Sequence, residues 1–324
     1  MGLKTKHLAV LGLIVFVYIV SRVGYETIIE NILSLNPLYI LPILGVTGGN
    51  VLVKSYKWRL VIRAHGADYP LKDSVKVFLI GMFTGLLTPG RAGDLIRALY
   101  LNKENVTFGK SASTVVIDRL LDILSLFLLF FLSVIWLGRA FGGFQISMPT
   151  ALLFLGGVVF LAYLLFQRDL VKKLLRPFYA NFLPETYKPA LKMGFNDFYD
   201  SLGRLDRADM ALPAFLSILS WLLTGLEGYL VARSLGLDIS YLTMMAFIPL
   251  ITLAELLPIS VSGLGTREVA VISLFSLIGL PMDTAVAFSI LYLVLAYWTA
   301  AFTGGLMWYL HPIEINSGPK KGIT

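Results

Sequence analysis

Charged residues stand beside helix-breaking residues in a first motif at positions 87–97, which reads Leu-Thr-Pro-Gly-Arg-Ala-Gly-Asp-Leu-Ile-Arg. Proline stops an incoming helix because its ring fixes φ and it has no N–H, and Gly90 and Gly93 allow a tight turn. The backbone amides that open the next helix attract anions, and Arg91 adds a planar charge that can grip a phosphate with two hydrogen bonds. The motif therefore has the chemistry of an anion site.

The acid of this motif can hold its arginines in place. Asp94 lies three residues from both Arg91 and Arg97, so it can pair with either of them on a helical surface. The alternative is a solvated loop whose arginines only set the topology of the chain. We favour a binding site, because the Pro/Gly geometry and the charges coincide.

A second motif at positions 255–268 repeats this combination and reads Glu-Leu-Leu-Pro-Ile-Ser-Val-Ser-Gly-Leu-Gly-Thr-Arg-Glu. Thr266 is suited to cap the helix that follows, and the start of that helix is expected to be exposed to a ligand. The candidate binding residues of this motif are Glu255, Ser262, Gly263, Gly265, Arg267 and Glu268. The alternative is a plain turn in solvent.

Two further groups of ionisable residues lie in apolar surroundings. Asp118 and Asp122 share one helical face, and Arg119 can reach Asp122. This group either caps a helix or belongs to the site by holding Arg91 or Arg267. Glu227 interrupts the apolar stretch 211–232, where a carboxylate in hydrocarbon costs at least about 2.5 kcal/mol. It should therefore face the interior, as an inter-helix bridge or as a cargo or proton-coupling site.

The composition places these motifs in a membrane protein. Of the 324 residues, 57% are hydrophobic and 15% charged, and the mean hydropathy is +0.78, whereas soluble domains are about 45–50% apolar and about 25% charged. Without cysteine, and with its three histidines far apart, the chain is expected to bind no metal or cofactor. The net charge of +7 fits basic cytoplasmic loops better than a nucleic-acid partner, since no nucleic-acid motif is present.

The predicted fold is an all-α polytopic membrane protein with about six full spans and two broken-helix hairpins. About 20 apolar residues are needed to cross a bilayer, and six stretches come near that length: 8–23, 37–53, 120–137, 149–166, 211–232 and 284–310. The stretches 75–88 and 241–257 are shorter and end at the two motifs, so we expect re-entrant hairpins there. Such backbone is stable at membrane depth only beside protein or a water-filled cavity.

Basic residues set the expected orientation. They concentrate in the connections 54–76, 91–110 and 167–210 and at both ends of the chain. By the positive-inside rule, these connections and both termini are cytoplasmic, in a multi-pass protein of the cell membrane. The connection 167–210 is expected to lie on the membrane surface as amphipathic helices, and residues 311–324 form a polar tail.

The order of elements predicts one membrane domain made of two inverted repeats. Residues 1–144 and 145–310 each contain two spans, a hairpin and a third span, so an odd number of crossings turns the second repeat upside down. Discontinuous helices that meet at mid-depth are typical of transporters. We also interpret Lys54, Lys57, Trp58 and Arg59 as an anchor at the headgroups, and the runs Gly48-Gly49-Asn50, Gly156-Gly157 and Gly304-Gly305 as points of close helix packing.

The two motifs resemble a known family. Residues 88–97 with 115–122, and then residues 258–268, are similar to the two signatures of the lysylphosphatidylglycerol synthase transmembrane region, also called the flippase-like or UPF0104 family. The resemblance covers nearly the whole chain. Asp94 stands where the family usually has Glu, and Ser262-Gly263 where it usually has Gly-Gly. Fused members carry a soluble aminoacyl-transferase domain that is missing here, so the resemblance implies lipid translocation and not lysyl transfer.

These observations predict a lipid flippase for a phosphate-bearing lipid, such as a phospholipid, a glycolipid or a polyprenyl-phosphate-linked lipid. The expected partners are lipids with anionic or phosphate headgroups, together with a lipid-modifying or glycosyltransferase enzyme. Two other functions stay open, a membrane enzyme acting on a lipid phosphate and a secondary transporter of small solutes. We expect no enzymatic activity, because no nucleotide-binding, serine-hydrolase or zinc-protease motif occurs in the sequence.

Overall fold

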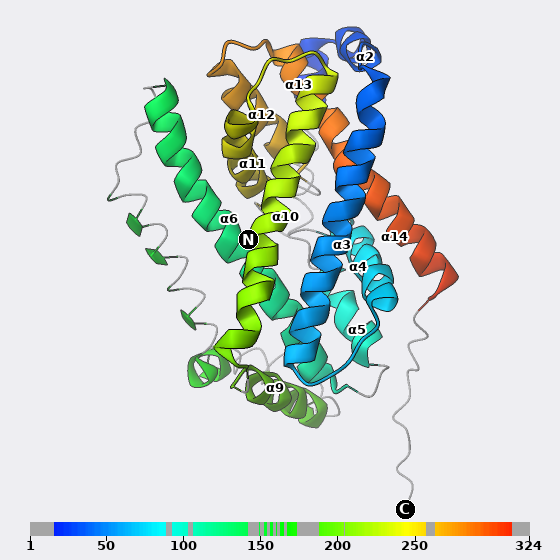
Figure 1. Cartoon of the computed structure of the whole chain (residues 1–324), viewed down its shortest axis with the longest axis vertical. Coiled ribbons are helices and arrows are strands. Elements are labelled where there is room, and N and C mark those ends of the chain that lie inside the picture. Colours follow the sequence, from blue (N-terminus) through cyan, green and yellow to red (C-terminus); the bar gives the residue numbers. More distant parts are fainter. Residues whose placement is uncertain are drawn as a thin grey trace, which may run out of the picture.

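The apolar stretches of the sequence fold as helices in the computed structural model of the chain (Figure 1). The structure describes residues 16–88, 93–102, 106–141, 149, 152–153, 156–157, 160, 163–164, 167–173, 188–203, 205–256 and 263–312. These residues contain helices and turns and no β-strand. The expected all-α class is therefore confirmed.

The first half of the chain contains α2 (Tyr25–Leu33), the 3-10 turn η1 (Pro37–Tyr39), α3 (Ile40–Ala64), α4 (Leu71–Leu86), α5 (Ile96–Asn102) and α6 (Phe108–Phe141). Helices α4 and α5 form the first hairpin. The later helices are α9 (Lys188–Gly203), α10 (Arg207–Ser234), α11 (Tyr241–Leu256), α12 (Thr266–Ser276), α13 (Met282–Tyr292), the π-helical turn η4 (Leu293–Trp298) and α14 (Thr299–Leu310). Side chains open two of them: Asn36 accepts a bond from the Leu38 amide before η1, and Asp206 accepts one from the Ala208 amide before α10.

In the part of the chain that the structure describes, four helical segments are long and apolar enough to cross a membrane: Pro37–Ala64, Phe108–Ala140, Ala208–Ser234 and Met282–Leu310. They confirm four of the six predicted spans, and the first two of them extend well beyond the predicted ranges. Of the predicted span 8–23, residues 16–23 are described and are helical. The predicted span 149–166 lies largely outside the described residues.

Polarity is inverted relative to a soluble protein, which supports the membrane assignment. Large apolar side chains are exposed along the outer faces of the spans, including Leu41, Leu52, Leu132, Phe215 and Phe302. Fully buried side chains include a lysine and two arginines. Lipid can cover the apolar exterior, whereas charges in a bilayer must face the protein interior.

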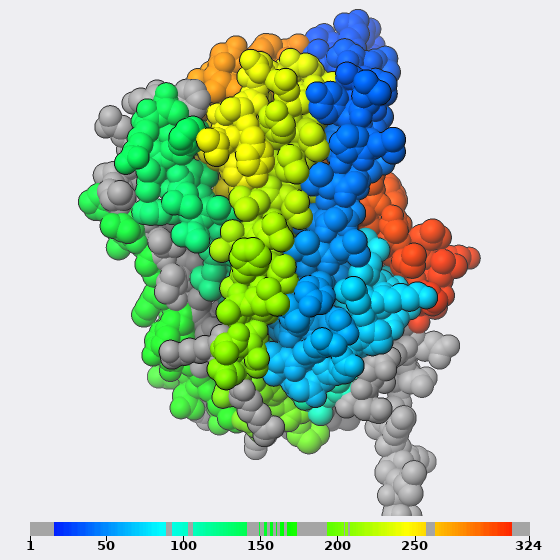
Figure 2. All heavy atoms as spheres, viewed as in Figure 1, coloured from blue at the N-terminus to red at the C-terminus, as the bar shows by residue number. Residues whose placement is uncertain are grey.

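Two central helices hold the bundle together. Helices α3 and α10 pack against one another and lie side by side on the face seen in Figure 2. The first hairpin, α4 and α5, lies toward one end of the molecule, and the second, α11 and α12, lies toward the other end (Figure 1). The structure therefore has two broken-helix hairpins approaching from opposite ends.

Each hairpin packs against the last long helix of the other half of the chain. Helix α4 packs on α14, and α11 packs on α6, while the second limbs α5 and α12 pack on the helices that follow them, α6 and α13. Two inverted repeats could pack in this reciprocal way, and the repeats themselves stay a prediction. The division at residue 144 stays a prediction.

Glycine serves close helix packing at one of the three runs predicted for it. A Cβ on Gly304 of α14 would lie 1.9 Å from the Leu79 carbonyl oxygen of α4, so the two backbones touch there. A Cβ on Gly48 or Gly49 of α3 would have no neighbour within 4 Å. A Cβ on Gly156 or Gly157 would have no neighbour within 4 Å either, so the packing role predicted for the glycines of these two runs is wrong.

Candidate functional site

The two limbs of the first hairpin are joined by backbone contact at Gly93. A Cβ on this residue would lie 2.1 Å from the Thr84 carbonyl oxygen, so only glycine fits. The Gly93 amide donates to Thr88 Oγ1 at 2.7 Å, and Thr84 Oγ1 donates to the Gly93 carbonyl at 2.8 Å. The tip itself, including the predicted site residues Gly90 and Arg91, lies outside the described residues.

Behind this hairpin lies a group of six ionisable residues that we name the first charge cluster: Lys57, Asp94, Arg97, Asp118, Arg119 and Asp122. Arg97 of α5 is fully buried, and its Nη1 lies 2.9 Å from Asp118 Oδ2. The guanidinium carbon lies 5.0 Å from the ring centre of Trp58 and 4.9 Å from that of Phe78. These aromatic faces favour the cation while they exclude water from it.

Lys57 of α3 is the centre of the first charge cluster. It is fully buried, its Nζ lies 3.0 Å from Asp118 Oδ1 and 3.2 Å from Ser217 Oγ, and it also pairs with Asp122. The interpretation of Lys57 as a headgroup anchor is therefore wrong, because α3 turns this side chain toward α6 and α10. Ser217 in turn donates to Asp122 at 2.6 Å.

The pairing predicted between Asp94 and Arg97 is also different in the structure. The Asp94 carboxylate pairs with Arg119 of α6, and only its backbone carbonyl receives a hydrogen bond from Arg97, at 3.4 Å. The Asp94 side chain is 6% exposed and that of Arg119 is 30% exposed. Of the three cations in the first charge cluster, Arg119 is the one that solvent or a ligand can reach.

The second hairpin holds a smaller group that we name the second charge cluster: Arg267, Glu268, Glu255 and the hydroxyl of Ser289. Arg267 is buried, with Nη2 2.8 Å from Glu268 Oε1 and Nε 2.8 Å from Ser289 Oγ. Ser289 also donates to Glu268 at 2.8 Å. Glu255 lies farther from the arginine, with its Oε1 3.8 Å from Arg267 Nη1.

The start of α12 is closed by its own carboxylate. The helix begins at Thr266, and the Gly265 amide donates to Glu268 Oε2 at 2.6 Å, so Gly265 rather than Thr266 is the N-cap. Gly263 and Gly265 have φ of +74° and +86°, which favour glycine. The exposed helix start predicted here is therefore already occupied by Glu268, and Ser262 lies outside the described residues.

A polar seam runs between α3 and α10 and includes the buried Glu227. Asn50 donates to Thr224 Oγ1 at 3.0 Å and to Glu227 Oε1 at 3.4 Å, and Ser220 donates to Asn50 at 3.0 Å. The prediction that Glu227 faces the interior is confirmed. Lys54 of α3 lies in electrostatic range of both Glu227 and Asp122, and it thus connects this seam with the first charge cluster.

Sequence reasoning missed the residues that surround Glu227 in this seam, although helical spacing contained the signal. Ser217, Ser220, Thr224 and Glu227 recur at intervals of three or four along an otherwise apolar helix, which places them on one face. Asn50, Lys54 and Lys57 follow the same spacing on the neighbouring helix. Two such faces in a membrane protein would be expected to pair.

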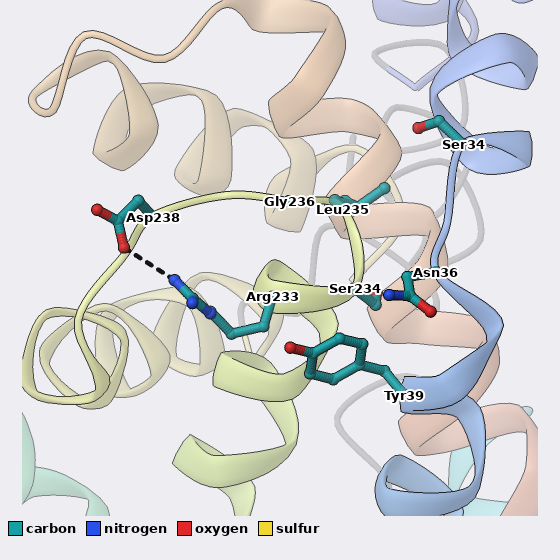
Figure 3. Close-up of a pocket in the computed structure, with 8 residues that line it drawn as sticks. All are labelled: Ser34, Asn36, Tyr39, Arg233, Ser234, Leu235, Gly236 and Asp238. Atoms are coloured by element: carbon teal, nitrogen blue, oxygen red, sulfur yellow. Dashed lines mark hydrogen bonds and ion pairs between the residues drawn. The ribbon is translucent and has the colours of Figure 1, made fainter.

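An open depression of about 640 Å³ lies away from both hairpin motifs, where α10 ends. Its lining residues are Ser34, Asn36, Tyr39, Arg233, Ser234, Leu235, Gly236 and Asp238 (Figure 3). Arg233 pairs there with Asp238 at 2.8 Å, which leaves the arginine partly exposed at the end of its helix. The expectation from the sequence that the two hairpin tips meet near mid-membrane under a cavity open to lipid stays a prediction.

The family profile of the lysylphosphatidylglycerol synthase TM region matches residues 7–304. The chain belongs to this family. The matched range includes both hairpins, both charge clusters and the polar seam, so the site described above lies within the lysylphosphatidylglycerol synthase TM region.

Relatives that match over most of their length are UPF0104 membrane proteins of archaea. One from Methanocaldococcus jannaschii is 24% identical over 331 residues, which covers 98% of each chain. One from Methanothermobacter thermautotrophicus is 23% identical over 320 residues, covering 93% of this chain and 94% of the relative. One from Pyrococcus horikoshii is 21% identical over 330 residues, covering 94% and 96%. Membership of this family gives the chain a role connected with membrane lipids.

Proposed function

We propose that the protein is a flippase that moves a phosphate-bearing lipid between the two leaflets of the cell membrane. The observation that carries this proposal is the first charge cluster, in which three cations and three carboxylates surround a broken helix inside a membrane protein. Ionisable groups at membrane depth are costly and commonly mark a substrate path. The family supports a lipid as the substrate, since its name is that of the membrane region of a lipid synthase.

The cations of the two clusters differ in burial, and we assign them different roles on that basis. Arg97, Lys57 and Arg267 are sealed from solvent and bound to acids, so they position the hairpins rather than touch the lipid. The partly exposed Arg119 is the described cation that can receive the phosphate, with Asp94 as the partner it leaves. A guanidinium exchanges one carboxylate for one phosphate without losing its bidentate geometry. Arg91 joins it in this proposal as the arginine of the hairpin tip.

Alternating access follows from the reciprocal packing. If each hairpin moves with the long helix of the other half, rocking of the halves exposes the site first to one leaflet and then to the other. The apolar tail of the lipid stays in the bilayer beside the exposed leucine and phenylalanine side chains. The charged headgroup alone crosses through protein.

The test is headgroup accessibility in vesicles that contain the purified protein and a fluorescent phospholipid. An impermeant quencher added outside reports how quickly labelled headgroups arrive from the inner leaflet. Wild-type protein should accelerate this arrival, and Arg119→Ala should remove the acceleration. The matched control is Arg139→Ala, which removes an exposed arginine at the other end of the same helix and should leave the rate unchanged.

Wild-type rates from Arg119→Ala would reject the assigned contact. Chemical turnover of the headgroup by purified protein in detergent would instead favour an enzyme acting on a lipid phosphate. Uptake of a water-soluble compound that is insensitive to the lipid composition would favour a solute transporter. The same vesicles serve all three measurements.

The proposed orientation places the end with α9 in the cytoplasm. The α3–α4 connection and the start of α6 lie at this end, with Arg63, Lys72 and Lys110, whereas α2 with Glu26 lies at the other (Figure 1). The chain has no cysteine, so single cysteines can report on each side. In intact cells an impermeant maleimide should label Glu26→Cys and spare Lys72→Cys.

A further inference from the structure

The polar seam has the same spacing on both of its helices, α3 and α10, which lie side by side in Figure 2. On each helix its residues recur at intervals of three, four and three, so each set lies on one helical face. The α3 set is Thr47, Asn50, Lys54 and Lys57, and the α10 set is Ser217, Ser220, Thr224 and Glu227. All of them except Lys54 are buried. Two matched polar faces therefore meet inside the bundle.

Contacts at one end of the seam and at its middle fix how the two helices pair. Lys57 Nζ lies 3.2 Å from Ser217 Oγ, and Asn50 Nδ2 lies 3.0 Å from Thr224 Oγ1. Between these contacts the chain moves back by two turns on α3 and forward by two turns on α10. The helices are therefore antiparallel, and each turn toward the start of α3 is matched by a turn toward the end of α10.

The next turn of this register brings Thr47 opposite Glu227. Thr47 lies one turn before Asn50 on α3, and Glu227 lies one turn beyond Thr224 on α10. Asn50 donates to Glu227 Oε1 at 3.4 Å, and Thr47 acts on the same carboxylate. The Thr47 side chain is buried, and its Oγ1 has no hydrogen-bond partner within the described part of the chain. Such a buried oxygen is a position where an ion or an ordered water is expected.

A correspondence within the sequence relates the two ends of the seam. The same residue types recur at one constant interval: Arg63 and Arg233, Gly66 and Gly236, Asp68 and Asp238, Arg97 and Arg267. Both glycines have a positive φ, 71° and 72°, and both turns carry an Arg–Asp pair, at 3.2 Å and 2.8 Å. The same interval relates Thr47 to Ser217 and Lys57 to Glu227. The position of Thr47 opposite Glu227 is thus equivalent to that of Ser217 beside Lys57, with the charge reversed.

The end of the seam at Lys57 shows how a cation is held there. The Lys57 ammonium lies between oxygen atoms of two helices, 3.2 Å from the Ser217 hydroxyl and 3.0 Å from the Asp118 carboxylate. At the equivalent end, a carboxylate and a hydroxyl face one another, and the hydrogen bond that Glu227 accepts comes from a neutral amide. A cation can bind both of these oxygens, whereas a water would satisfy the hydroxyl without adding positive charge beside the carboxylate.

We propose that Glu227, Thr47 and Thr224 form a binding site for a monovalent alkali cation in the polar seam. Carboxylate and hydroxyl oxygens are ligands for hard cations, and a single carboxylate suits a single positive charge, whereas Ca²⁺ sites usually combine several carboxylates. Asn50 holds the site together, because its Nδ2 bonds both Thr224 and Glu227. The expectation that the chain binds no metal rested on cysteine and histidine and did not consider these oxygen ligands.

Lys54 is a cation in electrostatic range of this site. It lies beyond Asn50 from Thr47 along α3, with its Nζ 5.8 Å from the centre of the Trp221 ring. Its charge repels a second cation beside Glu227, so Lys54→Gln should tighten the binding of the alkali cation. Loss of an oxygen ligand should have the opposite effect. The two variants therefore separate electrostatics from damage to the seam.

A bound cation joins the two halves of the chain, because α3 belongs to the first half and α10 to the second. It draws Thr47 toward Glu227 and holds the seam closed at the end remote from Lys57. This consequence rests on the proposed flippase function, in which the halves rock against one another. We therefore expect lipid movement to depend on Na⁺.

The experiment measures thermal unfolding of the purified full-length protein in detergent, in sodium chloride and in choline chloride of equal ionic strength. A ligand of the folded state raises the unfolding temperature as its concentration rises, so Na⁺ should stabilise the wild type and choline should not. Thr47→Val keeps the shape of the side chain and removes the oxygen. It should unfold like the wild type in choline and bind Na⁺ at least about tenfold more weakly. Thr303→Val removes an exposed hydroxyl that bonds a backbone carbonyl of its own helix, and as the matched control it should keep the full response to Na⁺.

Equal unfolding of the wild type in the two salts would overturn the cation site, and so would a full Na⁺ response in Thr47→Val. A stability that changes with pH but not with Na⁺ would identify the ligand of Glu227 as a proton and would overturn the site as well. If Thr47→Val fails to fold, Lys54→Gln decides. An affinity for Na⁺ that is unchanged or weaker in Lys54→Gln would contradict the site.

Vesicles that contain the protein and a fluorescent phospholipid test the consequence for lipid movement. Wild-type protein should move lipid faster under a Na⁺ gradient than with choline on both sides, and Thr47→Val should lose this difference. Lipid movement that does not respond to Na⁺ would reject the coupling. Na⁺ binding in detergent without any lipid movement in vesicles would leave the cation site standing and reject the flippase.

Discussion

The two hairpins use arginine in the same way but differ in how firmly they are held. In each, the buried arginine of the second limb, Arg97 or Arg267, binds a polar group on the helix that follows. Around Arg97, three cations and three acids are paired at close range. Around Arg267, Glu268 and Ser289 lie at 2.8 Å and Glu255 lies farther away, at 3.8 Å. The comparison contrasts one hairpin fixed by six ionisable residues with another whose arginine is held most closely by Glu268 and Ser289.

The largest effect is expected from unbalancing the first charge cluster. Lys57→Met leaves Asp118 and Asp122 buried with one cation fewer, and breaking a buried ion pair costs about 3–5 kcal/mol. Adding Asp122→Asn restores the balance and should recover most of this loss. Unfolding in detergent micelles measures both variants. If the double variant is less stable than Lys57→Met alone, charge balance is not what fixes this hairpin.

A second large effect is expected where the limbs of the first hairpin touch. The Cβ in Gly93→Ala would lie 2.1 Å from a backbone carbonyl that cannot rotate away, and overpacking of this kind costs about 1–3 kcal/mol. Gly48→Ala on α3 is the control, because its Cβ would meet no atom within 4 Å. The control should keep wild-type stability or gain a little. Equal stability of the two variants would show that the hairpin is not held closed at Gly93.

Sequence reasoning predicted the helices and hairpins of this site better than the contacts between its side chains. The hairpins followed from proline and glycine at the end of short apolar stretches, and the burial of Glu227 followed from the cost of charge in a bilayer. The ion-pair partner of Asp94 could not be predicted in this way. Helical spacing offered only arginines near in the sequence as partners, whereas the observed partner, Arg119, is brought to Asp94 by the packing of α6. The contact of Tyr292 with Tyr297 was missed because a 3.6-residue period cannot reveal a π-helical turn.

Neutralising one acid in each cluster tests the difference between them directly. Asp118→Asn removes the carboxylate that holds both Lys57 and Arg97 and should cost several kcal/mol, about 3–5. Glu255→Gln removes the carboxylate that lies 3.8 Å from Arg267 and keeps an oxygen that can accept from Tyr297, so its loss of stability should be smaller, about 1 kcal/mol. Unfolding of the two variants in the same detergent gives the contrast. Equal losses would show that the second cluster is as tightly balanced as the first.

The smallest effect on stability is expected from His65, which belongs to neither charge cluster. Its contribution to the pH dependence of stability must be separated from that of the acids before the two hairpins can be compared. Burial lowers the pKa of this imidazole, Lys110 lowers it further, and the Nδ1–H bond to the Val61 carbonyl at 2.7 Å acts in the opposite direction. Its folded-state pKa therefore lies below the unfolded value of about 6.5. The unfolded chain then binds more protons, so stability is full above that value and falls as the pH drops through the folded-state pKa.

One such group changes the free energy of unfolding by at most about 1.4 kcal/mol per pH unit. His65→Gln should remove this loss between pH 7 and pH 5 and leave the pH dependence of the acids. Urea unfolding of both proteins at each pH gives the difference. An unchanged pH dependence of stability in His65→Gln would show that protonation of this imidazole does not contribute to it.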